Sequence, residues 1–269
     1  MTDQTSPIDF SVEDGIAVVV MARPKQRNAF SPKFQEDFRA IVDECRTRDD
    51  INAVVLSGMD GVFSAGGDIK GMVARAQEGG YPPEFMRNRL YNTHRMLQDF
   101  RNMEKPVIAA VDGPAYGGGF GLALCADFIL ASERAVFCSV FCRIGAIPDY
   151  GVLFTLPRMV GLQRAKELMA TGRPVDANEA KAIGIAMDVY PAERLHDEAM
   201  SLARRMQDAS AGAFGITKRI ANQAFDNDAD ALLEMEAAGQ AICLAGDYHK
   251  DAVNRFVEKR PLRFNWEAE

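Results

Sequence analysis

Four short apolar runs constrain the fold more than any other feature of this sequence. They are rich in Val, Ile and Ala, are bounded by turn residues, and lie at 15–21, 51–58, 105–113 and 126–132. Between them, the segments 31–48 and 82–103 carry apolar residues at a helical period. The four apolar runs predict buried strands. Buried strands that alternate with amphipathic helices are typical of an α/β layered fold.

The pattern changes after about Ala192, where helical segments follow one another with no strand between them. The last two segments, 228–246 and 247–260, carry apolar residues on more of their circumference than a surface helix needs. Core packing and a subunit interface explain this equally well. The sequence therefore predicts a core at 1–191 and a helical region at 192–269.

Composition limits the classes of partner. The formal net charge of −7 argues against a general nucleic-acid binder, which needs a basic face, but not against a small molecule that carries phosphate. The five cysteines are odd in number and lie partly in apolar runs, which favours free thiols, and their spacing suggests no zinc site or other metal site. No signal-peptide pattern and no membrane-spanning run is evident, so we expect a cytoplasmic protein without a membrane partner.

Two glycine-rich turns, at 62–72 and 112–127, are the strongest candidates for a ligand site. Each follows an expected strand and leads into a helix, so each offers free backbone N–H groups to an anion. Neither places its glycines as in the phosphate-binding loops of nucleotide-binding proteins. Two turns that each supply one donor are better suited to holding one oxygen from two sides. The alternative is a pair of tight turns with no ligand.

The motifs "RPKQRNAFS", "FSAGGDIK", "KPVIAAVDGPAYGGGFGLALCAD" and "GAIPDYGVLFTLPRMVG", in this order, resemble the crotonase (enoyl-CoA hydratase/isomerase) superfamily. The resemblance spans nearly the whole chain. It implies an α/β fold, the crotonase (ClpP-like) spiral of ββα turns, with a C-terminal helical region for trimerisation and for covering coenzyme A. It further implies an acyl-CoA thioester as the partner, a homotrimer or dimer of trimers, and no cofactor beyond the coenzyme A of the substrate.

The same resemblance assigns the site residues by position. The N–H groups of Gly67 and Gly118 would hold the thioester oxygen and stabilise the enolate that forms when a neighbouring proton leaves. Ala65, Asp68 and Ile69, from the first glycine turn, would line the substrate. The positions of the two glutamates that activate water in the hydratases of the family hold Gly121 and Phe141, and neither residue can move a proton. Gly121 and Phe141 are also expected to contact the substrate, and Gly121 to leave room for a bulkier acyl group.

Asp149 is the remaining candidate for the proton carrier. By position it resembles the single aspartate of the phenylacetate-pathway isomerases, which include epoxyphenylacetyl-CoA and enoyl-CoA isomerases. An ordinary aspartate is a weak base, but the apolar neighbours Phe141, Ile147, Tyr150 and Phe154 are expected to raise its pKa by desolvation. The alternative is a solvated turn aspartate, because Pro-Asp-x-Gly is a good turn sequence by itself.

His94 lies on the expected helix at 82–103, where 4-chlorobenzoyl-CoA dehalogenases also carry a histidine. Those enzymes pair it with an aspartate at the position of Asp149 and a tryptophan at the position of Phe141. His94 is therefore a candidate second acid or base. The alternative is a polar residue on the exposed face of the helix.

Basic residues near both ends of the chain are candidates for the coenzyme A phosphates. Arg23, Lys25 and Arg27 match the family's adenine and phosphate loop, and Lys259 with Arg260 would reach the nucleotide of a neighbouring subunit. Basic residues at such places are equally well explained as solubilising groups.

The sequence thus favours an acyl-CoA double-bond isomerase that uses Asp149 and the two glycine amides. The alternatives are enoyl-CoA hydration, an aryl-CoA dehalogenase-like reaction with His94, and a non-catalytic scaffold that binds coenzyme A. The identity of the acyl group does not follow from the sequence.

Overall fold

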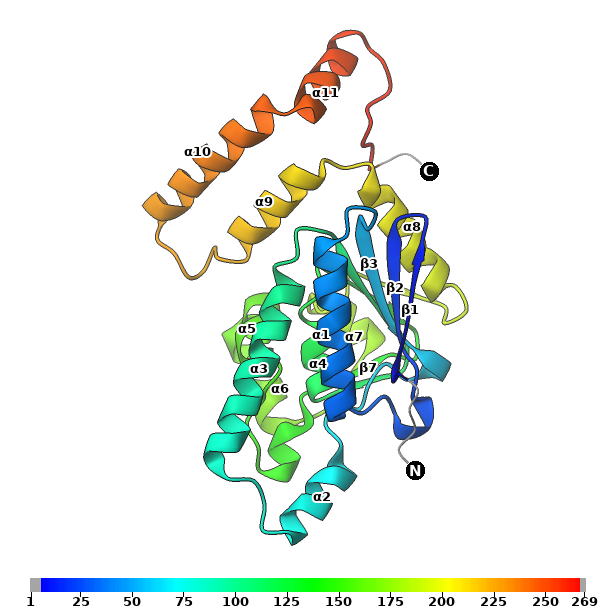
Figure 1. The fold of residues 1–269 in the computed structure, drawn as a ribbon, viewed down its shortest axis with the longest axis vertical. Coiled ribbons are helices and arrows are strands. Elements are labelled where there is room, and N and C mark those ends of the chain that lie inside the picture. Colours follow the sequence, from blue (N-terminus) through cyan, green and yellow to red (C-terminus); the bar gives the residue numbers. More distant parts are fainter. Residues whose placement is uncertain (1–5, 267–269) are drawn as a thin grey trace.

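A six-stranded sheet forms the central layer of the computed structural model, which describes residues 6–266 (Figure 1). Its strands, in spatial order, are β1 (Ile8–Glu13), β2 (Ile16–Met21), β3 (Ala53–Gly58), β4 (Val107–Val111), β6 (Phe128–Ser132) and β9 (Asp188–Tyr190). β1 pairs with β2 in antiparallel fashion, and the other neighbours are parallel. The four strands expected from the apolar runs are confirmed as β2, β3, β4 and β6.

A second, three-stranded sheet lies beside the first. It contains β5 (Pro114–Tyr116), β7 (Val136–Cys138) and β8 (Val175–Asp176). Two isolated parallel bridges outside the named strands connect loops of the chain in the same way: one joins Ser64 to Ala115, and the other joins Phe30 to Gly67. Successive turns of the chain are therefore stacked, and the two glycine-rich turns belong to neighbouring turns of the stack.

Eleven α-helices and three 3₁₀ helices occur within residues 6–266. The α-helices are α1 (Pro32–Thr47), α2 (Ile69–Gln77), α3 (Pro83–Arg101), α4 (Gly118–Ala123), α5 (Val152–Val160), α6 (Leu162–Thr171), α7 (Ala177–Ala182), α8 (Leu195–Gln207), α9 (Ala211–Ala221), α10 (Ala229–Ala245) and α11 (Asp247–Val257). The 3₁₀ helices are η1 (Pro24–Gln26), η2 (Met59–Gly61) and η3 (Val140–Ile144). The two expected helices are confirmed as α1, which begins after the N-cap Ser31, and α3. None of the described helices is long and apolar enough to cross a membrane.

The central sheet is covered on both faces, which explains why its strands are apolar without alternation. One core contains the α1 side chains Phe34 and Phe38 with Phe100 of α3. The other core lies under α8, whose Leu202 and Met206 pack with residues of β2, β3 and β4. α8 thus packs on the sheet although it lies within the helical region expected at 192–269. No strand follows β9 in the part of the chain that the structure describes.

All five cysteines are free, as expected. Cys45, Cys125 and Cys138 are buried, and Cys142 and Cys243 are half-buried. Free Cys in an interior behaves as a small apolar side chain.

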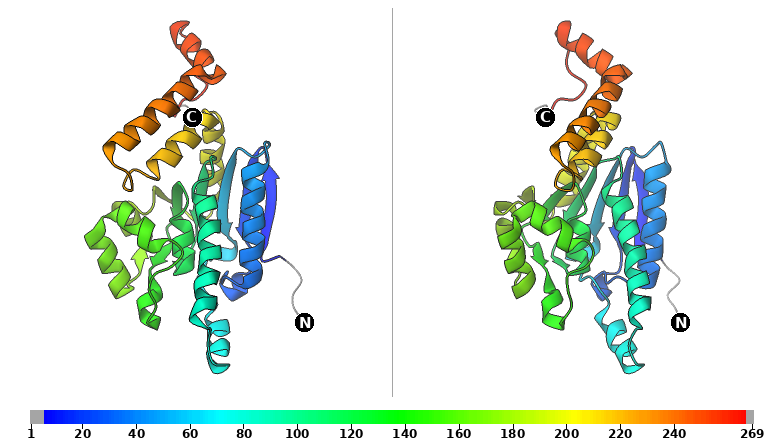
Figure 2. Two further views of the ribbon diagram at one scale, coloured as in Figure 1. Left: turned by 60° about the vertical axis from the view of Figure 1, so that its left-hand side comes forward. Right: turned by 90° about the vertical axis from the view of Figure 1, so that its left-hand side faces the viewer.

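α9, α10 and α11 extend away from the sheet, and α9 connects them to the core (Figures 1 and 2). A buried ion pair holds α9: Lys218 Nζ lies 2.7 Å from Asp127 Oδ2 and also donates to the carbonyl oxygen of Lys105 at 3.1 Å. The same Oδ2 atom accepts a hydrogen bond from the Val107 amide at 2.8 Å. Lys218 is only 6% exposed, so its charge depends on this partner.

We therefore predict that Lys218→Met lowers the free energy of unfolding by about 3–5 kcal/mol, because it leaves the Asp127 carboxylate buried without its cation. Urea denaturation followed by circular dichroism measures the change. Arg219→Met is the matched control on the same helix, since Arg219 forms an exposed pair with Glu104 whose loss costs about 1 kcal/mol or less. A double variant that adds Asp127→Asn should recover part of the loss, and no recovery would contradict the pairing.

Candidate active site

The two glycine-rich turns lie directly against each other. A Cβ atom built on Gly66 would lie 2.7 Å from the Gly118 nitrogen, and one built on Gly119 would lie 2.5 Å from the Ser64 carbonyl oxygen. Gly66 also has a φ of +78°, a backbone conformation that residues with a side chain rarely adopt. Only glycine permits this approach, so the fold brings together two turns that are separated by about fifty residues in the sequence.

Two buried polar side chains hold the first of these turns. Ser64 Oγ donates to the carbonyl oxygen of Asn28 at 2.8 Å and accepts from the Gly66 amide at 3.0 Å. Asn28 Nδ2 donates to the carbonyl oxygens of Val62 at 2.7 Å and Phe63 at 3.1 Å, and Asn28 Oδ1 accepts from the Arg23 amide at 2.7 Å. Neither residue was predicted from the sequence. The signal for Asn28 was its type, because asparagine tolerates the left-handed conformation found here, with a φ of +50°.

The amides of Gly67 and Gly118 are the two candidate oxyanion donors. Within residues 6–266, neither N–H group donates a hydrogen bond to another protein group. Gly118 is the first residue of α4, and the tip of Met72 lies next to Gly67. Both amides are therefore available to an oxygen atom of a ligand.

The other residues expected around the first turn have local partners. The Ala65 amide donates to the carbonyl oxygen of Arg27 at 2.8 Å, and Asp68 caps α2 by accepting from the Gly71 amide at 3.1 Å. Ile69 begins α2 and is exposed. These contacts give Ala65 and Asp68 a structural role in the turn, and their predicted contact with substrate stays a prediction.

The expectation that Gly121 leaves room for a bulky acyl group is wrong. A Cβ atom on Gly121 would lie 2.5 Å from the Tyr150 carbonyl oxygen and 2.7 Å from Tyr150 Cβ, so the space is already filled. The Tyr150 ring also lies over Gly118, where a Cβ atom would be 3.1 Å from Cδ2. It packs on Phe30 with 5.0 Å between ring centroids, and its hydroxyl accepts from Gln35 Nε2 at 2.9 Å. Gly118 and Gly121 thus accommodate Tyr150.

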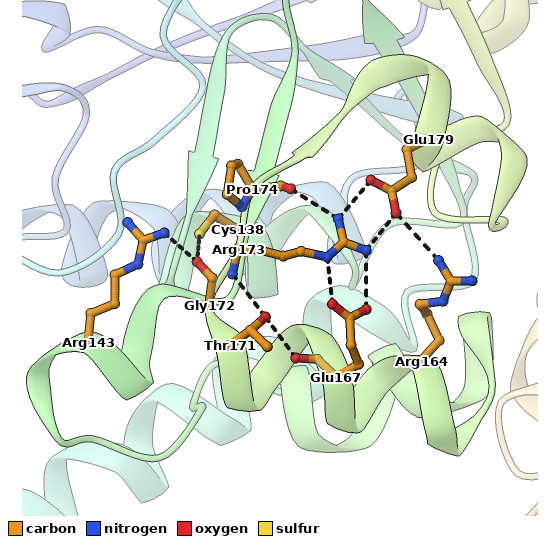
Figure 3. Close-up of polar contacts among 9 residues, drawn as sticks. All are labelled: Cys138, Arg143, Arg164, Glu167, Thr171, Gly172, Arg173, Pro174 and Glu179. Carbon is orange, nitrogen blue, oxygen red and sulfur yellow. Dashed lines mark hydrogen bonds and ion pairs between the residues drawn. The ribbon is translucent and has the colours of Figure 1, made fainter.

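Phe141 lies in the core and not in a substrate cavity. It is 8% exposed, belongs to η3, and its Cζ lies 3.7 Å from the position of a Cβ on Gly117. The segment around it is fixed at the end of α6, where Arg143 Nη2 and Cys138 Sγ both approach the Gly172 carbonyl oxygen, at 2.7 and 3.1 Å (Figure 3). The predicted contact of Phe141 with substrate stays a prediction.

A surface ion network stabilises the same corner. The Arg173 guanidinium lies between the Glu167 and Glu179 carboxylates, with closest distances of 2.5 and 2.7 Å (Figure 3). The network joins the end of α6 to α7 across β8. It therefore supports the η3 segment from outside and has no contact with the candidate site.

Asp149 and His94 line one cavity of about 810 Å³ between α3, the segment 146–155 and the end of α9. The apolar wall of the cavity contains Met86, Leu90, Leu97, Ile147, Leu153 and Phe154. The fold therefore brings together the two candidate acid and base residues, which the sequence analysis treated separately. The glycine amides do not line this cavity. Tyr150, whose ring lies over Gly118, directly follows Asp149 in the chain.

Burial raises the pKa of Asp149 from its ordinary value of 3.8 to about 6, against the opposing effect of the Arg89 charge. The predicted desolvation of this carboxylate is confirmed. Apolar Ile147 and Phe154 line the same cavity, and Tyr150 is buried beside it. A carboxylate with this pKa is a far better base near neutral pH than an exposed aspartate. His94 is on an exposed part of α3 and makes no hydrogen bond within the described residues.

The candidate residues for the coenzyme A phosphates are divided between two ends of the molecule. Arg23, Lys25 and Arg27 lie in and around η1, and the bond from Ala65 to Arg27 joins this loop to the first glycine turn. Lys259 follows α11, which lies at the end of the molecule opposite α2 (Figure 1). Lys259 therefore does not join the site of its own chain, and its proposed contact with a neighbouring subunit stays a prediction.

We predict that Asp149→Asn raises the stability of the folded protein by about 2 kcal/mol above pH 6. The folded chain holds the Asp149 proton up to about pH 6, whereas the unfolded chain releases it near 3.8. Between these values the folded state binds more protons than the unfolded state, so the free energy of unfolding of the wild type falls as the pH rises. The asparagine variant has no such group and does not lose this stability. Urea denaturation from about pH 4 to pH 8 should show the gain growing towards about pH 6 and then remaining constant.

Asp112→Asn is the matched control with the opposite sign. Burial acts to raise the pKa of Asp112, but hydrogen bonds from Arg134 and Ser132 outweigh it and lower the pKa below 3.8. Its removal should therefore destabilise the protein at neutral pH. A neutral or destabilising effect of Asp149→Asn at high pH would show that the Asp149 carboxylate is solvated.

Known proteins resemble the chain over nearly its whole length. A family model described as "Enoyl-CoA hydratase/isomerase" matches residues 11–268. A crotonyl-CoA hydratase of Syntrophomonas wolfei is 32% identical over 257 residues, covering 94% of this chain and 95% of that protein. A 1,2-epoxyphenylacetyl-CoA isomerase of Escherichia coli is 30% identical, covering 94% and 96%. A crystal structure of an enoyl-CoA hydratase/isomerase from Cupriavidus metallidurans superposes with a TM-score of 0.91 at 34% identity, covering 98% and 97%.

Proposed function

The chain belongs to the enoyl-CoA hydratase/isomerase family and has the crotonase fold, and from this premise we propose that it is an acyl-CoA double-bond isomerase that works through Asp149. One observation carries the proposal. Asp149 is a carboxylate in an apolar cavity with its pKa raised to about 6, and the positions of the two hydratase glutamates hold Gly121 and Phe141. The site thus has one base of suitable strength and lacks the pair of carboxylates that hydration uses in the family.

In the proposed reaction, the Asp149 carboxylate removes a proton from the carbon between the thioester carbonyl and the double bond. The electron pair moves into the carbonyl, so that a dienolate forms. The Asp149 carboxylic acid then returns the proton to the far end of the dienolate. The double bond moves into conjugation, and the substrate and product have the same atoms. One group with a pKa near the working pH serves both steps.

The Gly67 and Gly118 amides are the proposed oxyanion donors. They belong to turns that are packed together, and neither donates a hydrogen bond within the described chain. The charge of a dienolate gathers on the former carbonyl oxygen, where fixed N–H donors stabilise it without reorganisation. The acyl group would then extend towards Asp149 and the cavity.

A second candidate function rests on the shared cavity of Asp149 and His94. Two acid or base groups that face one space suit a reaction with water, either hydration or an aryl-CoA dehalogenase-like substitution. The name of the S. wolfei relative favours hydration, and that of the E. coli relative favours isomerisation. Nothing in the geometry supports a non-catalytic scaffold over an enzyme.

We also propose a homotrimer or dimer of trimers built through the helices after α8. The support is the set of exposed apolar side chains on α10 and α11, among them Ile242, Phe256 and Val257, which are 66–75% exposed. Apolar groups at this exposure on projecting helices are typical of an interface.

We predict that Asp149→Asn abolishes isomerisation but preserves the affinity for acyl-CoA, because asparagine keeps the shape and cannot accept a proton. Assays with 3-enoyl-CoA and 2-enoyl-CoA substrates, with products read by mass, measure both isomerisation and the gain of water. In deuterated water the wild type should exchange label into the acyl chain, and the variant should not. Water addition to crotonyl-CoA should be very slow in both.

His94→Gln is the matched control, since His94 lines the same cavity. It should change turnover only modestly. If His94→Gln abolished turnover while Asp149→Asn remained active, the reaction would be assigned to the histidine. Hydration of crotonyl-CoA at an ordinary enzymatic rate, on the order of 10 per second or faster, would overturn the isomerase proposal.

We predict that Gly67→Pro lowers turnover about 10²–10³-fold, because it removes one oxyanion donor. Gly67→Ala is the control, since it keeps the N–H group and its Cβ would meet only the movable tip of Met72 at 2.6 Å. Gly118 is a poorer site for this test because any side chain there presses on Tyr150 and Phe30. Equal activities of the two Gly67 variants would show that the thioester oxygen is held elsewhere.

A further inference from the structure

The cavity that contains Asp149 also contains an arginine without an anionic partner. Arg101, the last residue of α3, lines the same wall of the cavity as His94 and Leu97. Within residues 6–266, no carboxylate lies within ion-pairing distance of Arg101. Its one side-chain hydrogen bond goes to the Asn222 carbonyl oxygen at 3.2 Å, so most of its five N–H donors are unused.

Two neighbouring arginines differ in this respect: Arg219 also lines the cavity, and Arg158 lies beside it on the Phe154 ring. Arg158 pairs with Asp226 at 2.6 Å and Arg219 pairs with Glu104 at 2.9 Å. Arg101 instead lies with its guanidinium carbon 4.6 Å from the centroid of the Phe154 ring. Burial is also the main cause that lowers the pKa of Arg101. An unpaired, partly desolvated cation is costly unless an anion joins it.

Arg101 belongs to α3, and Asp149, from the segment before α5, lies near a different point along that helix. Asp149 is under the influence of the Arg89 charge, and Arg101 lies about 18 Å further along the helix axis than Arg89, at about 1.5 Å per residue. The wall between them is apolar, with Leu90 and Leu97 on α3. The cavity therefore offers a base at one place, an apolar wall, and a cation at the other.

We propose that the acyl group taken by this site carries a carboxylate at its far end, which Arg101 binds. The inference rests on the proposed acyl-CoA site and deepens it by naming the substrate class, acyl-CoA thioesters of dicarboxylic acids. The planar guanidinium fork matches a carboxylate with two hydrogen bonds, and the apolar wall accommodates the intervening chain. The substrate then supplies the close anionic partner that Arg101 lacks within residues 6–266. Asp226 lines the same cavity and acts on Arg101 at longer range, but it is already paired with Arg158.

The test is a comparison of three saturated acyl-CoA thioesters of equal chain length, ending in a carboxylate, a carboxamide or a methyl group. Titration calorimetry gives the dissociation constants without any reaction. The wild type should prefer the carboxylate over the other two by on the order of ten- to hundredfold, and Arg101→Met should lose this preference. Arg219→Met, in the same cavity, should keep it.

The outcomes separate the inference from the proposed function. Equal binding of the three ligands by the wild type, or an unchanged preference in Arg101→Met, overturns the role of Arg101 and leaves the acyl-CoA site standing. A merely structural role would weaken all three ligands alike. Absence of binding of any acyl-CoA by the wild type overturns the proposed function and this inference together. Where Arg101→Met fails to fold, Arg101→Lys is the second variant: it keeps the charge but loses the two-pronged hydrogen bonding, so it should keep only part of the preference, and an unchanged preference overturns the role of Arg101.

Discussion

The hydrogen bonds of Asn28 and Ser64 are the constraint on which the candidate site depends. They join the loop after β2 to the first glycine turn, and Ser64 lies directly against Gly119 in the second turn. Both side chains are buried, so each lost partner would leave an unsatisfied polar group at a cost of about 1–3 kcal/mol. The network therefore fixes where the Gly67 and Gly118 amides lie before any ligand arrives, which is the preorganisation that oxyanion stabilisation requires.

Tyr150 links this network to the candidate base. Its ring covers Gly118 and packs on Phe30, its backbone covers Gly121, and its hydroxyl is held by Gln35. These contacts keep Tyr150 in a left-handed conformation, with a φ of +50°, that a bulky residue adopts only under constraint. Asp149 directly precedes it, so the packing of Tyr150 sets where the carboxylate enters the cavity.

The C-terminal helices take part in the cavity as well as in the proposed assembly. The C-cap of α9 and the turn after it supply Asn222 and Asp226 to the cavity wall, and Lys218 on α9 is anchored to Asp127 inside the core. The buried ion pair thus positions a wall of the cavity relative to α3. Truncating the chain after α8 would remove this wall, so the candidate active site needs the helices that the sequence pattern sets apart from the core.

The sequence by itself determined the elements and the reactive groups, because both depend on local patterns. The apolar runs of β2, β3, β4 and β6 and the capped start of α1 are properties of short segments, and the four ordered motifs identified the family and the position of Asp149. The tertiary structure decided what surrounds these groups. Only it showed that Tyr150 fills the space over Gly121, that Phe141 is a core residue, and that His94 and Arg101 share the cavity of Asp149. Such neighbours come from segments far apart in the chain, and burial and pKa depend on all of them together, so no local pattern contains them.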